Sequence, residues 1–70
     1  DYAPAQFNLG VMYFQGQEGI PKDLAMAYVW FSRSAHQGDE DARIMRDKIA
    51  SRLTAKQIAH AQGLLQAPVE

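Results

Sequence analysis

The amino-acid sequence predicts an all-α fold of about four helices, and three observations support this prediction. Apolar residues recur at helical spacing along most of the chain. Glycine and proline residues interrupt that spacing at residues 16–22, and a capping box interrupts it again at residues 54–57. No segment shows the strict alternation of a half-buried β-strand. Because the connections are short, we expect neighbouring helices to form antiparallel hairpins.

The composition bounds the size and class of the protein. Seventy residues allow one small domain, and a hydrophobic content of 47% is ordinary for a globular chain. Seven basic and eight acidic residues nearly cancel, so whole-molecule attraction to nucleic acid is not indicated. No apolar run is long enough to span a membrane. The chain begins with Asp1 and not with Met, so we expect it to be a fragment of a longer protein.

The first predicted helix covers about residues 3–15, with Asp1 as its cap. It carries two apolar stripes. The first stripe, which we expect to face the second helix, contains Ala5, Leu9, Met12 and Tyr13, and the second contains Phe7, Val11 and Phe14. Glycine disfavours helix interiors, so Gly10 predicts that a neighbouring helix approaches closely at this point.

Asp23 caps a second predicted helix over about residues 24–37, and Gly38 ends it at the position that favours glycine. One side of this helix contains Ala27, Trp30, Phe31, Ser34 and Ala35. The only tryptophan of the chain lies in the middle of that side. A large ring between small neighbours predicts that another helix comes close there.

The second half of the chain also contains a helix, a break and a helix. Acidic residues at 39–41 begin a third predicted helix of about residues 40–52, whose inward side contains Ala42, Met45, Ile49 and Leu53. Thr54 and Gln57 match the capping box of a fourth helix, which runs to about Gln66 before Pro68. The inward residues of this last helix are Ile58, Ala61 and Leu65.

The first half of the chain resembles a Sel-1-like repeat, a relative of the tetratricopeptide repeat. The matching residues are Ala5, Leu9, Gly10, Tyr13, Gly16, Gly19, Ile20, Asp23, Ala27, Trp30, Ala35, Gly38 and Ala42. The resemblance implies an α/α solenoid of antiparallel helical hairpins, wound as a right-handed superhelix. The match of Trp30 to the repeat pattern implies that it forms the core of the hairpin. It implies one repeat at residues 1–38 and, at residues 39–70, a degenerate terminal repeat or capping helix pair like those of many bacterial members. One extra residue between Gly16 and Gly19 departs from the pattern and should only lengthen a loop.

The resemblance also implies a function: a protein–protein interaction module, scaffold or adaptor that binds a protein or peptide on its concave face. In such repeats the first helix of each hairpin lines this face. The corresponding residues are Phe7, Val11, Phe14, Ile44, Lys48, Ser51 and Arg52. They are apolar at one end and basic at the other, so we expect a ligand with apolar anchors and one or two acids. A competing interpretation is that the third helix covers the aromatic stripe and leaves no groove.

Two other functions stay open from the sequence. The chain could be the accessory arm of a larger enzyme, or it could self-associate as a homodimer through the exposed stacking face of its first helix, which carries Phe7, Val11 and Phe14. Five of the seven basic residues lie between Arg43 and Lys56. We interpret them as a solvated helix face, with an anionic partner as the alternative.

No residue pattern indicates catalysis, a cofactor or a metal ion, so we do not expect this chain to be an enzyme. His36 and His60 are the only histidines, and their spacing matches no metal-binding motif. No serine lies in a nucleophile elbow, and no lysine follows the glycines at phosphate-loop spacing. The absence of cysteine removes disulfides and thiolate ligands and does not identify a compartment.

Overall fold

Local hydrogen bonds begin three of the helices where the sequence predicts. The Asp23 carboxylate accepts from the Met26 amide at 3.1 Å, and the Asp39 carboxylate accepts from the Ala42 amide at 3.2 Å. Thr54 and Gln57 form the full capping box, with reciprocal bonds of 2.9 and 3.1 Å. Each side chain satisfies a backbone N–H group that the helix itself leaves unpaired.

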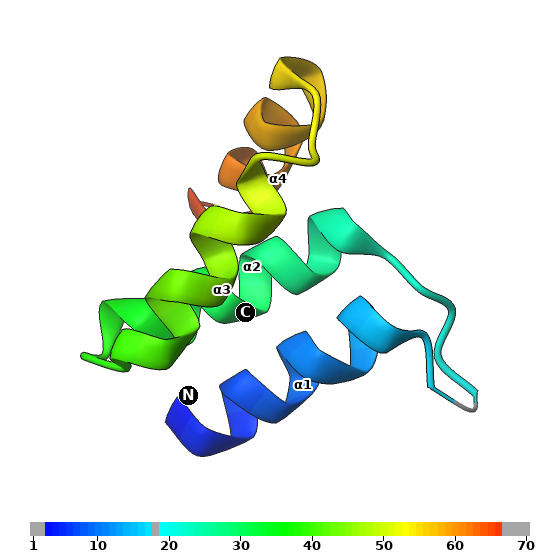
Figure 1. The fold of residues 1–70 in the computed structure, drawn as a ribbon. Coiled ribbons are helices and arrows are strands. Elements are labelled where there is room, and N and C mark those ends of the chain that lie inside the picture. The colour runs from blue at the N-terminus through cyan, green and yellow to red at the C-terminus, as the bar shows by residue number, and fades with distance from the viewer. Residues whose placement is uncertain (1–2, 18, 67–70) are drawn as a thin grey trace.

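The resulting architecture is all-α, as predicted. The computed structural model describes residues 3–17 and 19–66, and within these ranges it contains four helices and no strand (Figure 1). The helices are α1 (Ala3–Gln15), α2 (Leu24–His36), α3 (Glu40–Ala50) and α4 (Ala55–Gln66). The expected cap Asp1 and the helix-ending Pro68 lie outside the described residues.

The helix ends also follow from local chemistry. Gly16 and Gly38 have φ angles of +67° and +100°, which suit glycine, and they donate to the carbonyls of Met12 and Ala35 at 2.9 Å. Helix α3 ends at Ala50, two residues earlier than predicted. There the Ser51 hydroxyl donates to the Lys48 carbonyl at 2.7 Å, which competes with continuation of the helix.

Helix α2 is the centre of the fold, because α1, α3 and α4 all pack principally against it (Figure 1). Ala27, Phe31 and Ser34, which recur at helical spacing along α2, are fully buried. A Cβ atom added to Gly10 of α1 would lie 2.9 Å from two carbons of the Phe31 ring. The predicted close approach at Gly10 is therefore confirmed, and Phe31 is the side chain that fills the space.

Trp30 is not the core of the hairpin, so that prediction was wrong. Its side chain is half-buried, whereas the neighbouring Phe31 is 0% exposed. Successive residues of a helix point about 100° apart, so only one of these two rings can point between α1 and α3. The ring in that position is Phe31, and the Phe7 ring meets it edge-on with 5.2 Å between centroids.

The side of α1 that faces α2 also differs from the prediction. In α1, the side chains of residues 5–15 are described, and among these residues Gln6 and Gly10 are buried. Of the first predicted stripe, only Tyr13 packs against the core, while Ala5 is exposed. The second stripe, with Phe7, Val11 and Phe14, packs against the core along one flank of the Gln6–Gly10 line. Leu9 and Met12 lie half-buried on the opposite flank.

The second half of the chain adds fewer buried side chains to the core. Ala42 and Ile49 of α3 and Ala61 of α4 are at most 1% exposed, as their helical spacing predicts. Met45, Leu53 and Leu65 pack around them while partly exposed. Helices α3 and α4 therefore cover α2 mainly through small residues and one isoleucine.

Candidate functional site

The seven residues predicted to bind a partner come from α1, from α3 and from the turn after α3, and we call them the α1–α3 face. On α1, Phe7, Val11 and Phe14 are half-buried, and each packs in part against the core. On α3, Ile44 is 42% exposed, the largest exposure of any bulky apolar side chain in the described residues. Lys48, Ser51 and Arg52 are exposed. The face thus combines apolar side chains, most of them partly buried in the core, with two cations.

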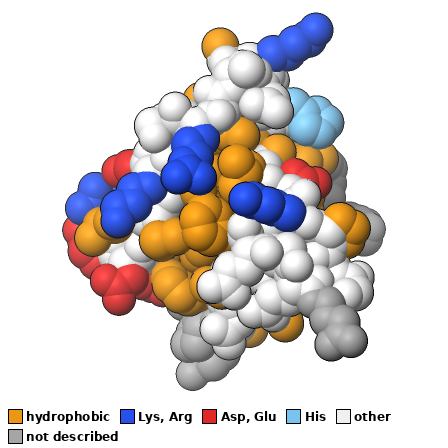
Figure 2. All heavy atoms as spheres, turned by 45° about the vertical axis from the view of Figure 1, so that its right-hand side comes forward, with side chains coloured by type: hydrophobic (Ala, Val, Ile, Leu, Met, Phe, Trp, Pro, Cys, Tyr) orange, Lys and Arg blue, Asp and Glu red, His pale blue; other side chains and the backbone are white. Residues whose placement is uncertain are grey.

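Helix α3 leaves the aromatic stripe of α1 partly open. It packs principally against α2 and only weakly against α1. One side of the molecule shows a continuous band of hydrophobic side chains with Lys and Arg side chains beside it (Figure 2). A surface of this composition can hold apolar anchors and orient an anionic group.

The charges of α3 divide into paired and unpaired groups. Arg43 contacts Glu40 at 2.8 Å and Asp47 at 3.4 Å, and Arg46 contacts Asp47 at 3.1 Å. The hydrogen bond that Arg43 donates to Glu40 raises the pKa of Arg43 above its ordinary value. Lys48 and Arg52 form no ion pair with any described residue. The unpaired cations Lys48 and Arg52 therefore lie on the α1–α3 face, together with the unpaired Asp41, which precedes Lys48 by two helical turns.

Arg52 also lines a pocket of about 420 Å³ between the start of α2 and the turn that joins α3 to α4. Its lining residues are Lys22, Asp23, Leu24, Ala25, Arg52, Leu53 and Gln57. Asp23 is occupied as the cap of α2, and Gln57 is occupied in the capping box. This pocket extends the basic end of the α1–α3 face toward Lys22.

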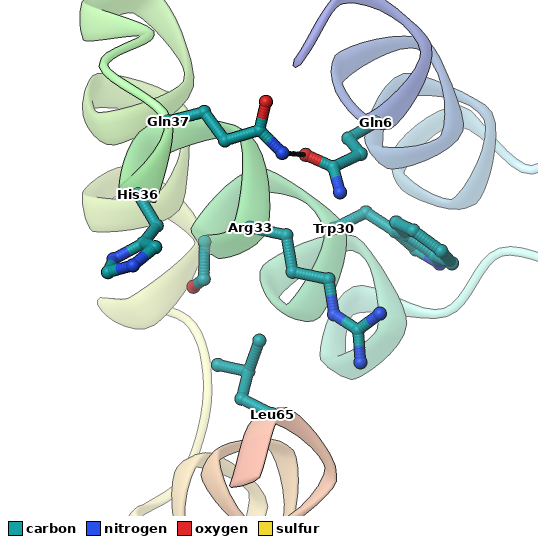
Figure 3. Close-up of a pocket in the computed structure, with 7 residues that line it drawn as sticks. Gln6, Trp30, Arg33, His36, Gln37 and Leu65 are labelled. Carbon is teal, nitrogen blue, oxygen red and sulfur yellow. Dashed lines mark hydrogen bonds between the residues drawn. The ribbon is translucent and has the colours of Figure 1, made fainter. Parts of the chain in front are cut away.

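A larger pocket, of about 640 Å³, lies on α2 between α1 and α4 (Figure 3). We call it the Trp30 pocket. Its lining residues are Gln6, Trp30, Ser32, Arg33, His36, Gln37 and Leu65. Gln37 donates to the buried Gln6 at 2.9 Å, which joins the end of α2 to α1 along one edge. Leu65 faces the pocket from α4.

Two polar atoms of the Trp30 pocket are buried without a hydrogen-bond partner. They are the indole nitrogen of Trp30 and the hydroxyl of Ser32. The Arg33 guanidinium lies 5.1 Å from the centroid of the Trp30 ring, within the range of a cation–π contact. Sequence reasoning missed this pocket because Gln6 and Leu65 meet only in the folded chain. The spacing of Trp30 and Arg33, three residues apart on α2, was the one local signal.

The comparison with known families decides what kind of chain this is. The sequence model of the Sel1 repeat matches residues 3–39, which is more than half of the chain. The chain belongs to the Sel1 repeat family. Sel1 repeats are generally protein-interaction modules and are typically not catalytic. No curated protein and no solved structure matches this chain.

The described part of this Sel1 chain also contains neither a metal-ligand cluster nor a membrane-spanning helix. Among residues 3–17 and 19–66, no three side chains of His, Asp or Glu gather so that they could hold a metal ion. No helix within those ranges is long and apolar enough to cross a membrane. His36 lies at the end of α2 on the rim of the Trp30 pocket, and His60 is exposed on α4.

Proposed function

We propose that this Sel1 domain is a scaffold or adaptor that binds a protein or peptide on its concave α1–α3 face. The observation that carries the proposal is the combination, on one face, of the exposed Ile44 with the unpaired Lys48 and Arg52. The family supports the class of function, because Sel1 repeats are generally protein-interaction modules.

The apolar part of the face supports anchoring of a partner. Val11 and Phe14 keep part of their surfaces open, and Ile44 is 42% exposed although it lies on a helix that packs against the core. Burial of such side chains contributes most of the affinity of protein interfaces, while the charged rim contributes mainly orientation. We therefore expect a ligand with one or two apolar side chains that contact these three residues.

The charges of the face support an acidic partner. Two of the three acids of α3, Glu40 and Asp47, are paired with Arg43 and Arg46, while the exposed Asp41 forms no ion pair with a described residue. Lys48 and Arg52 remain to attract a carboxylate, and Lys22 lies on the far side of the pocket that Arg52 lines. The expected ligand therefore carries an acid next to its apolar anchors.

The experiment is selection from a peptide library with the wild-type chain and three variants whose folding is first checked by circular dichroism. Ile44→Asp removes the exposed anchor, and Lys48→Glu reverses the charge of the basic end. Lys56→Glu on α4 is the matched control, because it makes the same charge change outside the face. The first two variants should lose most of the binding, and the control should keep it. Equal binding by all three variants would exclude this face.

Self-association is a second candidate function, and one observation favours it. The sequence assigned the contact between copies to Phe7, Val11 and Phe14, which pack in part against the core. Leu9 and Met12 on the opposite flank of α1 are half-buried and do not pack against the core cluster, so we now place the contact there. A second copy could cover this flank in the way that a preceding repeat covers it in a solenoid. Light scattering at high micromolar concentration should then give a dimer mass that Met12→Lys reduces to a monomer mass. A wild-type monomer under the same conditions would contradict self-association.

A further inference from the structure

We propose that the Trp30 pocket is a second binding site, for an extended segment of a partner polypeptide with an acidic side chain between two apolar ones. The site lies on α2 between α1 and α4, and its lining residues include none of the α1–α3 face. The inference therefore does not depend on the function proposed for that face.

The two unpartnered polar atoms point to a ligand that accepts hydrogen bonds. The indole nitrogen of Trp30 can only donate, and the Ser32 hydroxyl can donate as well. Buried polar side-chain atoms normally have partners in folded proteins, and here two without a partner among the described residues belong to side chains that line one pocket. Peptide carbonyl oxygens of an extended segment are acceptors of the right kind.

The charge of the pocket points to an acid at the centre of that segment. Arg33 and His36 line the pocket, and no Asp or Glu of residues 3–17 and 19–66 does. The Arg33 guanidinium forms no ion pair with a described residue, and it lies over the ring of Trp30 instead (Figure 3). A guanidinium prefers a carboxylate to an aromatic ring, because two charge-assisted hydrogen bonds can form in place of one weak cation–π contact.

The order of these residues on α2 fixes how the segment lies. At helical spacing, Arg33 lies between Trp30, toward α1, and Ser32, on the other side. The acidic side chain would thus meet Arg33, and the peptide carbonyls before and after it would meet Trp30 and Ser32. The flanking apolar side chains would contact the Trp30 ring and Leu65. Three extended residues span about 10 Å, which suits the width of one helix with its side chains.

The test uses the 70-residue chain and three short probe peptides. The first is acetyl-Leu-Glu-Leu-amide, the second replaces its glutamate by glutamine, and the third is acetyl-Ala-Ala-Leu with a free terminal carboxylate. Trp30, as the only tryptophan, reports binding by fluorescence, because Arg33 must leave its ring to reach the ligand. Calorimetry gives the affinities, with peptide up to about 5 mM, since a ligand of this size binds modestly.

The proposal expects the glutamate peptide to bind at least about tenfold more tightly than the glutamine peptide. Arg33→Gln should remove that difference, while the matched control Arg43→Gln and the α1–α3 variant Lys48→Glu should keep it. Ser32→Ala should weaken binding of both peptides without lowering the thermal midpoint, because its hydroxyl has no partner in the free protein.

Three results would overturn the proposal. The first is equal binding of the glutamate and glutamine peptides, and the second is an unchanged preference in the Arg33→Gln variant. The third is binding of the free-carboxylate peptide as tightly as the glutamate peptide, which would assign the pocket to chain termini. Circular dichroism of Arg33→Gln confirms that any loss of binding comes from a folded protein.

Discussion

The two halves of this chain are built in different ways. Helices α1 and α2 pack together as a hairpin, whereas α3 and α4 each pack principally against α2 and hardly against one another. In the first half, Gly10 of α1 lets the ring of Phe31 approach the helix backbone, and a side chain at residue 10 would meet that ring at 2.9 Å. In the second half, Gly63 of α4 has open space around it, with no atom within 4 Å of an added Cβ. Helices α1 and α2 therefore interlock, whereas α4 rests on α2 through the single buried Ala61.

This difference shows in which half of the chain the repeat pattern limits the choice of residues most. The family model matches residues 3–39, which contain the interlocked hairpin. Helices α3 and α4 need only a few small or apolar residues at the correct positions to cover α2. We therefore expect substitutions in α1 and α2 to lower the stability more than equivalent substitutions in α3 and α4.

The largest expected effect is that of Phe31→Ala. Loss of a fully buried phenylalanine costs about 3–5 kcal/mol, and a core of this size rarely supplies more than that. The variant should be unfolded at 25 °C, with the helical signal of its circular dichroism spectrum lost. A cooperative thermal transition close to that of the wild type would show that Phe31 is not the centre of the core.

Trp30→Ala is the matched comparison, since it truncates the neighbouring ring. Trp30 is half-buried, so its loss should cost about 1–2 kcal/mol, roughly half the value for a fully buried ring. This variant should stay folded, with a thermal midpoint lowered by several degrees. If Trp30→Ala unfolds and Phe31→Ala does not, the roles of the two rings are reversed.

These two residues show what the sequence predicts and what it leaves open. Caps and breaks depend on neighbours in the chain, so Asp23, Asp39 and the Thr54–Gln57 box predicted three helix starts. Trp30 and Phe31 both lie on the apolar side of α2, and only the positions of α1 and α3 decide which ring enters the core. Helical spacing does not contain that information.

The candidate sites divide in the same way. The exposed and basic part of the α1–α3 face, with Ile44 and Lys48, follows from helical spacing and the repeat. The Trp30 pocket joins Gln6, Arg33 and Leu65, which are far apart in the chain and meet only after α1 and α4 pack on α2. Sequence patterns within a single helix therefore could not predict this pocket.

A smaller loss of stability is expected at Asp39, between α2 and α3. The Asp39 carboxylate caps α3 and also accepts from the Ser34 hydroxyl of α2 at 3.0 Å. Asp39→Ala removes both bonds and should cost about 1–2 kcal/mol. Asp23→Ala removes the exposed cap of α2 and should cost about 1 kcal/mol. Urea denaturation measures both, and equal losses would mean that the bond to Ser34 contributes nothing.

Gly10→Ala tests the close approach of α1 and α2 directly. The added methyl group would lie 2.9 Å from the Phe31 ring, which is fully buried. Overpacking costs about 1–3 kcal/mol and outweighs the gain of about 1 kcal/mol from replacing glycine in a helix. The thermal midpoint should fall. A rise would mean that the two helices can separate slightly at no cost.

Gly63→Ala makes the same chemical change in α4. It should change the stability in the opposite direction and by the smallest amount. Gly63 lies inside α4 with a helical backbone, and an added Cβ would meet no atom within 4 Å. Only the propensity term remains, so the variant should be more stable by about 0.5–1 kcal/mol, mainly because the unfolded chain loses freedom. Urea denaturation should then show a higher midpoint with an unchanged slope. Because Gly63 is exposed, opposite signs of the two changes would show that the loss in Gly10→Ala comes from contact with Phe31 and not from the helix itself. A loss of stability in both variants would mean that α4 also packs closely on a neighbouring helix at Gly63.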